Sequence, residues 1–157
     1  MRQLQSLMIF AAALWTLLAF AVANAAEQEP VIVELTQVPC QFVESENSVD
    51  HGYTTTKKED CDAINAKTGD SRLAAATVTT LKPGKYIFRV TNKNVPYDLG
   101  FWLRGDGVVN RVTLPSVSGG GLKTGATKDY PIELKPGEYV YSCPLNTTPD
   151  YKLVVAE

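Results

Sequence analysis

The sequence predicts an all-β fold, a Greek-key β-sandwich, on two observations. A sequence motif of the form Leu-Lys-Pro-Gly-X-Tyr occurs twice, at 81–86 and at 134–139. Pro and Gly suit the two central positions of a type II turn, so each copy is expected to join two antiparallel strands. Apolar residues also alternate with polar ones beside both copies, which is typical of strands with one buried face. Two such corners in one chain favour a Greek-key sandwich.

The strands follow from this alternation. At the first motif, Tyr86, Phe88 and Val90 lie on one face of a strand. At the second, Ile132 and Leu134 lie on one face of the strand that leads into it. Shorter apolar runs predict the other strands, at 31–37, 76–81, 99–104, 110–114 and 151–155. The glycine-rich run at 118–121 is expected to be a turn.

One polar segment, at about 44–72, lacks the period-2 pattern. Within it, residues 57–67 are expected to form a short helix that ends at Gly69. We interpret the segment as a helix-containing insertion between the first two strands.

The first 25 residues have the pattern of a secretory signal. An apolar run from Leu7 to Val22 is followed by Ala23-Asn24-Ala25, a small-residue cleavage site. Cleavage would leave residues 26–157 as a single domain with no membrane anchor, located in the periplasm or secreted. This domain has 14 basic and 17 acidic residues, which argues against nucleic acid or an anionic membrane as partner.

Export would place the three cysteines in an oxidising compartment, where two of them can form a disulfide and the third remains a free thiol. A disulfide between Cys40 and Cys61 is favoured, because a long polar insertion gains most from a covalent link. The alternatives, in which Cys40 or Cys61 pairs with Cys143, stay open from the sequence.

With these strands in place, the chain resembles the cupredoxins over most of residues 26–157. The segments that carry the resemblance are 85–101, with its Asn-rich turn, and 136–143, which leads from Pro-Gly into Tyr-Ser-Cys. The most similar branch is the EfeO type, which includes domains linked to iron uptake. The resemblance implies a sandwich with a metal-ligand loop between the last two strands.

The resemblance also implies where copper ligands would fall. The Cys ligand matches Cys143, but Tyr97 stands at the first His position and Asn146 at the second. Pro149 or Asp150 stands near the axial Met position. A type 1 copper site needs a thiolate and two imidazoles, so no standard blue-copper centre is expected.

The more specific hypothesis is a non-standard metal site at the ligand-loop end. The insertion should emerge at the ligand-loop end, where His51, the only histidine of the chain, could join Cys143 and the carboxylates of Glu44, Glu46 and Asp50. In the simpler alternative, Cys143 is a small buried apolar residue and His51 is solvated.

These observations predict an exported protein that handles copper or iron by transient binding, with a metal-transport or redox protein as its partner. The alternative is a non-metal module that binds a protein or a small ligand. An enzyme is not expected, because a single histidine and carboxylates without a distinctive spacing provide no catalytic set.

Overall fold

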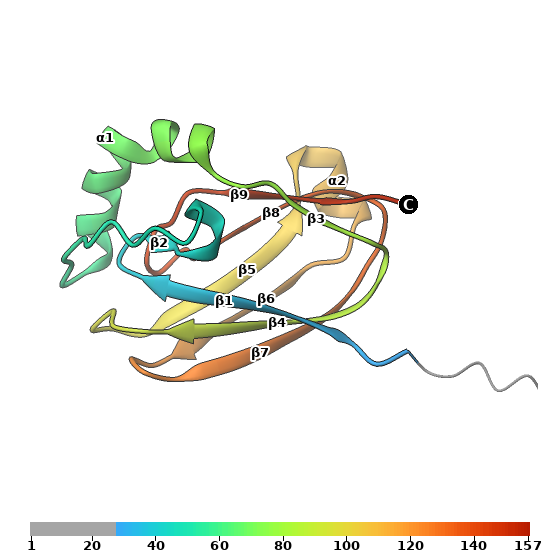
Figure 1. Cartoon of the computed structure of the whole chain (residues 1–157), viewed down its shortest axis with the longest axis horizontal. Coiled ribbons are helices and arrows are strands. Elements are labelled where there is room, and N and C mark those ends of the chain that lie inside the picture. The colour runs from blue at the N-terminus through green and yellow to red at the C-terminus, as the bar shows by residue number, and fades with distance from the viewer. Residues whose placement is uncertain (1–27) are drawn as a thin grey trace, which may run out of the picture.

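The computed structural model describes residues 28–157, and the predicted signal peptide and its cleavage site lie outside this range. Two β-sheets pack face to face, which confirms the predicted sandwich (Figure 1). The first sheet has, in order, β2 (Gln41–Phe42), β1 (Val31–Val38), β4 (Gly84–Asn92) and β7 (Thr127–Leu134). The second has, in order, β3 (Thr79–Leu81), β9 (Tyr151–Val155), β8 (Gly137–Ser142), β5 (Leu99–Gly105) and β6 (Val117–Leu122).

The alternation in the sequence does mark the buried faces. Tyr86, Phe88 and Val90 of β4 are buried and meet residues of the opposite sheet. The centre of the core is aromatic, and Phe101 lies within 5.1–6.1 Å, centroid to centroid, of four other rings, those of Phe42, Phe88, Tyr130 and Tyr141. Aromatic side chains bury large apolar areas, so these rings account for much of the burial between the sheets.

The two Pro-Gly corners were predicted to join antiparallel strands, and this prediction is wrong. Each corner passes from one sheet to the other, from β3 to β4 and from β7 to β8. The Pro-Gly residues determine that the chain reverses direction, but the packing of the core determines which strands pair. Strand β4 therefore lies between β1 and β7, and β8 lies between β5 and β9. The two corners lie side by side, since Gly84 pairs with Leu134.

The insertion is helical, as predicted, but its helix is longer than expected. A 3-10 turn, η1 (Glu44–Glu46), precedes α1 (Lys58–Ala75), which continues through Gly69. At the start of α1, the carboxylate of Asp60 accepts hydrogen bonds from the N–H groups of Thr56 and Lys57. Tertiary contacts of Arg72 hold the extra turns, so the low helix propensity of glycine does not end the helix. Helix α1 lies over the end of the sandwich that β1 runs towards (Figure 1).

Residues 110–114 were predicted as a strand, but residues 110–113 belong to the helix α2 (Gly107–Thr113) and Leu114 caps its end. Its close approach to β5 requires glycine, because a Cβ on Gly105 would lie 2.1 Å from the carbonyl oxygen of Asn110. Val112, which lies within the predicted strand, is largely exposed on α2. The glycine-rich run predicted as a turn is part of the edge strand β6, which pairs with β5.

Candidate functional site

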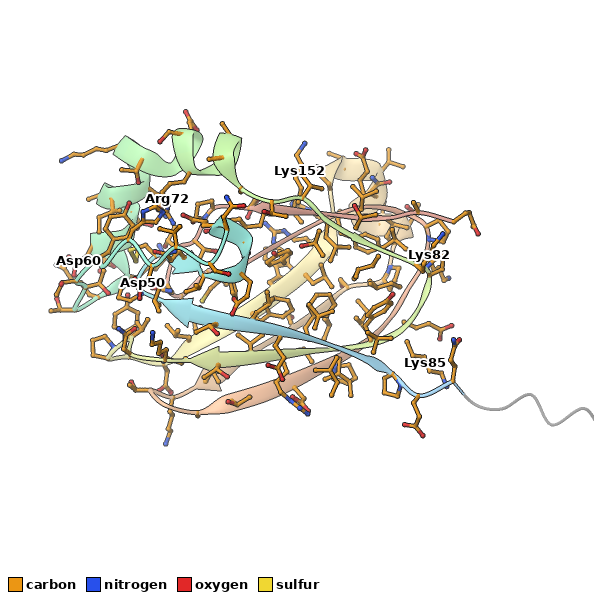
Figure 2. All side chains as sticks on the ribbon, viewed as in Figure 1. Asp50, Asp60, Arg72, Lys82, Lys85 and Lys152 are labelled. Carbon is orange, nitrogen blue, oxygen red and sulfur yellow. A yellow bond between two sulfur atoms is a disulfide. The ribbon has the colours of Figure 1, made fainter. Side chains whose placement is uncertain are left out.

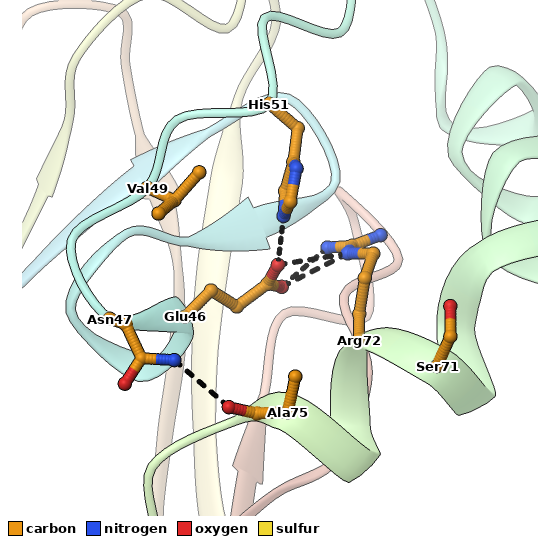
Figure 3. Close-up of a pocket in the computed structure, with 7 residues that line it drawn as sticks. All are labelled: Glu46, Asn47, Val49, His51, Ser71, Arg72 and Ala75. Carbon is orange, nitrogen blue, oxygen red and sulfur yellow. Dashed lines mark hydrogen bonds and ion pairs between the residues drawn. The ribbon is translucent and has the colours of Figure 1, made fainter.

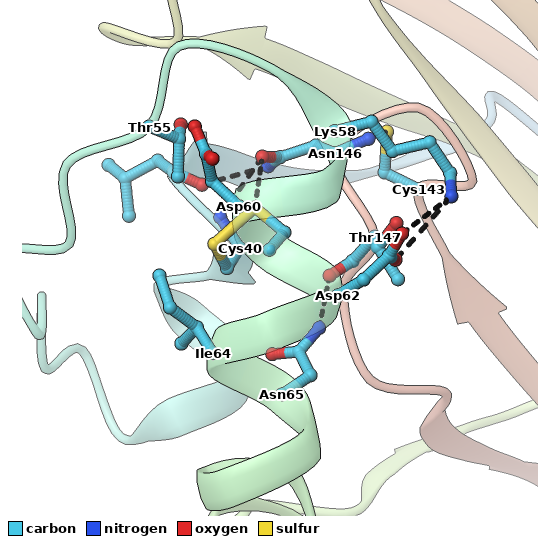
Figure 4. The surroundings of a disulfide bond; sticks show 12 residues. Cys40, Thr55, Lys58, Asp60, Asp62, Ile64, Asn65, Cys143, Asn146 and Thr147 are labelled. Atoms are coloured by element: carbon cyan, nitrogen blue, oxygen red, sulfur yellow. Dashed lines mark hydrogen bonds and ion pairs between the residues drawn. A yellow bond between two sulfur atoms is a disulfide. The ribbon is translucent and has the colours of Figure 1, made fainter.

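The ligand loop follows β8 and begins at Cys143, a free cysteine that is only 1% exposed. Its sulfur accepts hydrogen bonds from the backbone N–H groups of Gly100 at 3.4 Å and Asn146 at 3.2 Å. Its own N–H donates to the hydroxyl of Thr148. Figure 4 shows Cys143 and Asn146 on this loop, next to the disulfide between Cys40 and Cys61.

Burial sets the protonation state of this sulfur. Loss of solvation raises the pKa of the Cys143 thiol, and the N–H groups of Gly100, Leu145 and Asn146 offset only part of that rise. Cys143 is therefore a neutral thiol at ordinary pH, whereas metal ligation and nucleophilic attack need the thiolate.

The resemblance places Asn146 at the second imidazole position, and the side chain of Asn146 is completely buried. Its amide nitrogen donates to the carbonyl of Val38 at 2.9 Å, and its amide oxygen accepts from the N–H of Cys40 at 3.0 Å. The hydroxyl of Tyr97 donates to the same oxygen at 3.4 Å. Both ends of the amide are thus bonded to protein, and the side chain joins the ligand loop to the turn after β1.

The resemblance places Tyr97 at the first imidazole position, and Tyr97 is half-buried beside Asn146. Its hydroxyl also reaches the hydroxyl of Thr55 at 3.3 Å, in the insertion. Burial raises the pKa of Tyr97, so the phenol stays neutral. The structure therefore brings Tyr97, Asn146 and Cys143 together, and it does so as neutral groups.

The favoured disulfide is confirmed: Cys40 is bonded to Cys61, with their Cα atoms 5.1 Å apart. It links the turn after β1 to helix α1. The sulfur of Cys61 lies 3.3 Å from the amide oxygen of Asn146, so the disulfide packs directly against the ligand loop (Figure 4). Neither alternative pairing with Cys143 is formed.

These residues do not fit a type 1 copper ion. Such a centre needs a thiolate and two imidazoles, whereas this position offers a neutral thiol, a phenol and an amide whose oxygen and nitrogen are already bonded. Across residues 28–157, no three or more His, Cys, Asp or Glu side chains are placed to hold a metal ion.

His51 lies at this end of the molecule but has different partners from Cys143. Its Nε2 lies 2.6 Å from a carboxylate oxygen of Glu46, and its ring stacks on Tyr53 at 5.5 Å. Its backbone N–H donates to the side chain of Gln41. The structure thus brings His51 to one of the predicted carboxylates, while His51 and Cys143 share no hydrogen-bond partner among residues 28–157.

The other two carboxylates predicted to join His51, those of Glu44 and Asp50, accept hydrogen bonds from backbone N–H groups. Glu44 accepts a hydrogen bond from the N–H of Thr36 at 2.7 Å, and Asp50 accepts one from the N–H of Gly52 at 2.9 Å. Glu44 therefore ties η1 to strand β1, and Asp50 stabilises a turn of its own loop.

A buried ionic network around Glu46 was missed by the sequence reasoning. The guanidinium of Arg72 contacts both carboxylate oxygens of Glu46, the closest at 2.6 Å, and also donates to the carbonyl of Cys40 at 2.8 Å. The hydroxyl of Tyr151 donates to Glu46 as well. Figure 2 shows Arg72 beneath helix α1, facing the sandwich. The partners in this network are far apart in the sequence, so no local motif predicts the network.

Electrostatics keep this network charged. Burial opposes the charge of Glu46, but hydrogen bonds from Arg72 and Tyr151, together with the positive charge of Arg72, hold the pKa of the carboxyl below its usual value. Burial, and then the neighbouring Glu46, raise the pKa of Tyr151, which stays protonated. The network therefore contains one full ion pair that is shielded from water.

We expect the thiol of Cys143 to be poorly reactive in the folded protein, because it is buried and neutral. An aromatic disulfide reagent should react with it much more slowly in buffer than in denaturant, as followed by colour release. Equal rates in the two conditions would show that the loop exposes the thiol.

Comparisons with known proteins support the fold. The structure is similar to that of the cupredoxin auracyanin B, with a TM-score of 0.51 and 13% sequence identity, over 86% of this chain and 96% of the auracyanin chain. At this identity the similarity establishes a cupredoxin-like fold alone. No protein-family model and no curated protein sequence matches the chain. In the described part of the chain, no helix is long and apolar enough to cross a membrane.

Proposed function

We propose that this chain is an exported, cupredoxin-like binding module whose ligand loop has become a structural junction instead of a metal centre. The observation that carries the proposal is the side chain of Asn146. It stands where the resemblance places an imidazole, is fully buried, and bonds through both amide ends to Val38 and Cys40. In this position it ties the loop to the first strand, a role that a bound metal could otherwise play.

The covering of the loop supports the same function. Helix α1 and the disulfide lie against the loop, so the end of the sandwich that would face a redox partner carries the insertion instead. The surface available for recognition at this end is therefore formed by the insertion. We propose a protein or a small ligand as what it binds.

A metal titration of residues 26–157 tests the proposal. Cu(I), Cu(II) and Fe(III) are each added to the metal-free protein while its melting temperature is followed. A ligand that binds only the folded state raises the melting temperature with concentration. We expect no such rise. A concentration-dependent rise that the Cys143→Ser variant lacks would overturn the proposal.

The protein with Cu(II) is expected to be colourless. The intense visible absorption of blue-copper proteins comes from a copper thiolate held by two imidazoles, and the chain has one histidine, which contacts Glu46. An absorption spectrum of the mixture checks this. A strong band in the blue-copper region would mean that a second molecule supplies a ligand.

Transient handling of copper or iron, with a periplasmic metal-transport or redox protein as partner, is the second candidate. It is favoured by the position of Cys143 and by the two N–H groups that point at its sulfur. The resemblance to the EfeO-type branch adds iron as a candidate metal. Under this function, the melting temperature should rise with one of the three metals, and His51→Ala and Cys143→Ser should each reduce that rise.

A further inference from the structure

A pocket of about 300 Å³ opens between the insertion loop and helix α1 (Figure 3). Its volume is at the lower end of the range for small-molecule sites. It is lined by seven residues from η1, the following loop and the last turns of α1, namely Glu46, Asn47, Val49, His51, Ser71, Arg72 and Ala75.

The floor of the pocket is a buried ion pair with no net charge. The side chains of Glu46 and Arg72 are 4% and 5% exposed and form the ion pair of the buried network. Arg72 also donates to Asn65 and to the carbonyl of Cys40, so most of its hydrogen-bonding capacity is used inside the protein. The floor therefore presents a fixed, neutral pair instead of a free charge.

His51 provides the polar group that a ligand can reach. Its side chain is 32% exposed, and its Nε2 is held by the carboxylate of Glu46. Within residues 28–157, no hydrogen bond uses its other ring nitrogen, Nδ1. Because Nε2–H donates to an ionised carboxylate, a protonated His51 presents Nδ1–H as a donor. Ser71 also lines the pocket, but its hydroxyl donates to the carbonyl of Thr68 at 2.9 Å, so His51 remains the donor for a ligand.

The remaining wall is apolar. Val49 is 49% exposed, and Ala75 faces it from the last turn of α1 (Figure 3). Apolar surface of this kind gains from contact with a ligand's alkyl group. A charged donor beside a small apolar wall is complementary to a short amphiphilic anion.

From this geometry we infer that the pocket binds a small organic carboxylate with a short alkyl group. The carboxylate accepts a hydrogen bond from Nδ1–H of His51, and the alkyl group packs on Val49 and Ala75. This inference deepens the proposed function as a binding module, on which it rests, by naming the class of ligand.

Binding should be stronger when His51 is protonated. Glu46 from η1 and Tyr53 from its own loop contact the ring, and Arg72 from α1 contacts both of these side chains. Asp50 precedes His51 in the chain, and its carboxylate accepts from the N–H of Gly52. The charges of Glu46 and Arg72 offset each other, so a proton on His51 leaves the pocket lining with one net positive charge. Histidine changes charge between about pH 5 and 8, which makes this range the informative one.

The test uses isobutyrate as the probe and isobutyramide as its neutral match, added to residues 26–157 at about pH 5.5 and about pH 8. Chemical shifts of the His51 ring and the Val49 methyl groups are followed by NMR. We expect saturable shifts with isobutyrate at the lower pH, weaker binding at the higher pH and little effect of isobutyramide.

Two variants locate the binding. His51→Gln keeps an N–H donor that can reach Glu46 but removes the second ring nitrogen, and it should weaken isobutyrate binding by about tenfold or more, since a hydrogen bond to a charged group is lost. Lys67→Gln removes an exposed positive charge elsewhere on α1 and should leave binding unchanged.

Several results would overturn the inference: no saturable shifts, equal binding of the amide, or equal loss in both variants. None of these bears on the ligand loop, because the metal titration that tests the proposed function reports on Cys143. A failure of the pocket is therefore distinguishable from a failure of the binding-module proposal.

Discussion

Replacing Arg72 with Met is expected to destabilise the protein by about 3 to 5 kcal/mol, the usual cost of removing one partner of a buried ion pair. The variant leaves the carboxylate of Glu46 buried with only Tyr151 and His51 as donors, and it frees the carbonyl of Cys40. Methionine keeps most of the side-chain volume, so the loss reports on charge and hydrogen bonding. Urea denaturation provides the free energy of unfolding.

Arg89→Met is the matched control. Arg89 forms a two-point ion pair with Asp129 at 2.8 Å, but both side chains are well exposed. Surface pairs contribute about 0 to 1 kcal/mol, so this variant should lose little. If the two variants lost the same free energy, burial of the Glu46 network would not matter to stability.

The same network makes stability depend on pH. The folded pKa of Glu46 lies below its unfolded value, so the carboxylate contributes stability that is fully present above the unfolded pKa, about 4.3 for glutamate. That contribution is lost as the pH falls through the folded pKa. Arg72→Met should therefore flatten the acid limb of the stability profile, measured by denaturation from neutral pH downwards.

The double variant Cys40→Ser with Cys61→Ser should lose about 2 to 5 kcal/mol, as small exported domains do when a native disulfide is removed. The bond closes a loop with a sequence separation of 21 and holds α1 against the ligand loop. Thermal denaturation, with peptide mass mapping of the unreduced parent protein, measures both the loss and the pairing.

Reductant provides the control for this prediction. It should lower the stability of the parent protein to that of the double variant and leave the variant unchanged. A parent protein that is insensitive to reductant while its disulfide is reduced would show that the link contributes nothing to stability. A cross-linked peptide that contains Cys143 would contradict the pairing itself.

The fold class and most strands could be predicted because their signals are local. The period-2 pattern of Tyr86, Phe88 and Val90 follows from one face being buried, whatever the partner strand. The sheet assignment of the Pro-Gly corners could not be predicted, since pairing depends on contacts across the core. Helix α2 was missed because its valines favour strands, while the feature that positions it, the contact of Gly105 with Asn110, is tertiary.

The sequence predicted which residues lie together at the candidate site, but not the hydrogen-bond partners of those residues. The resemblance groups Tyr97, Asn146 and Cys143, and the structure brings these three residues together. That Tyr97 and Asn146 occupy former ligand positions stays a prediction. The bonds of Asn146 to Val38 and Cys40 span more than 100 residues of sequence, at separations of 108 and 106, so no motif reveals them. The role of a buried amide follows only from its three-dimensional surroundings.

The most direct test of the structural-junction account is hydrogen exchange of the Asn146 side-chain amide, measured by NMR with and without equimolar Cu(I). We predict slow exchange, because the amide is buried and donates to the carbonyl of Val38, and no change of its signal when Cu(I) is added. Fast exchange, or a shift of the Asn146 signal that saturates with Cu(I), would contradict the account and favour a metal site at Cys143.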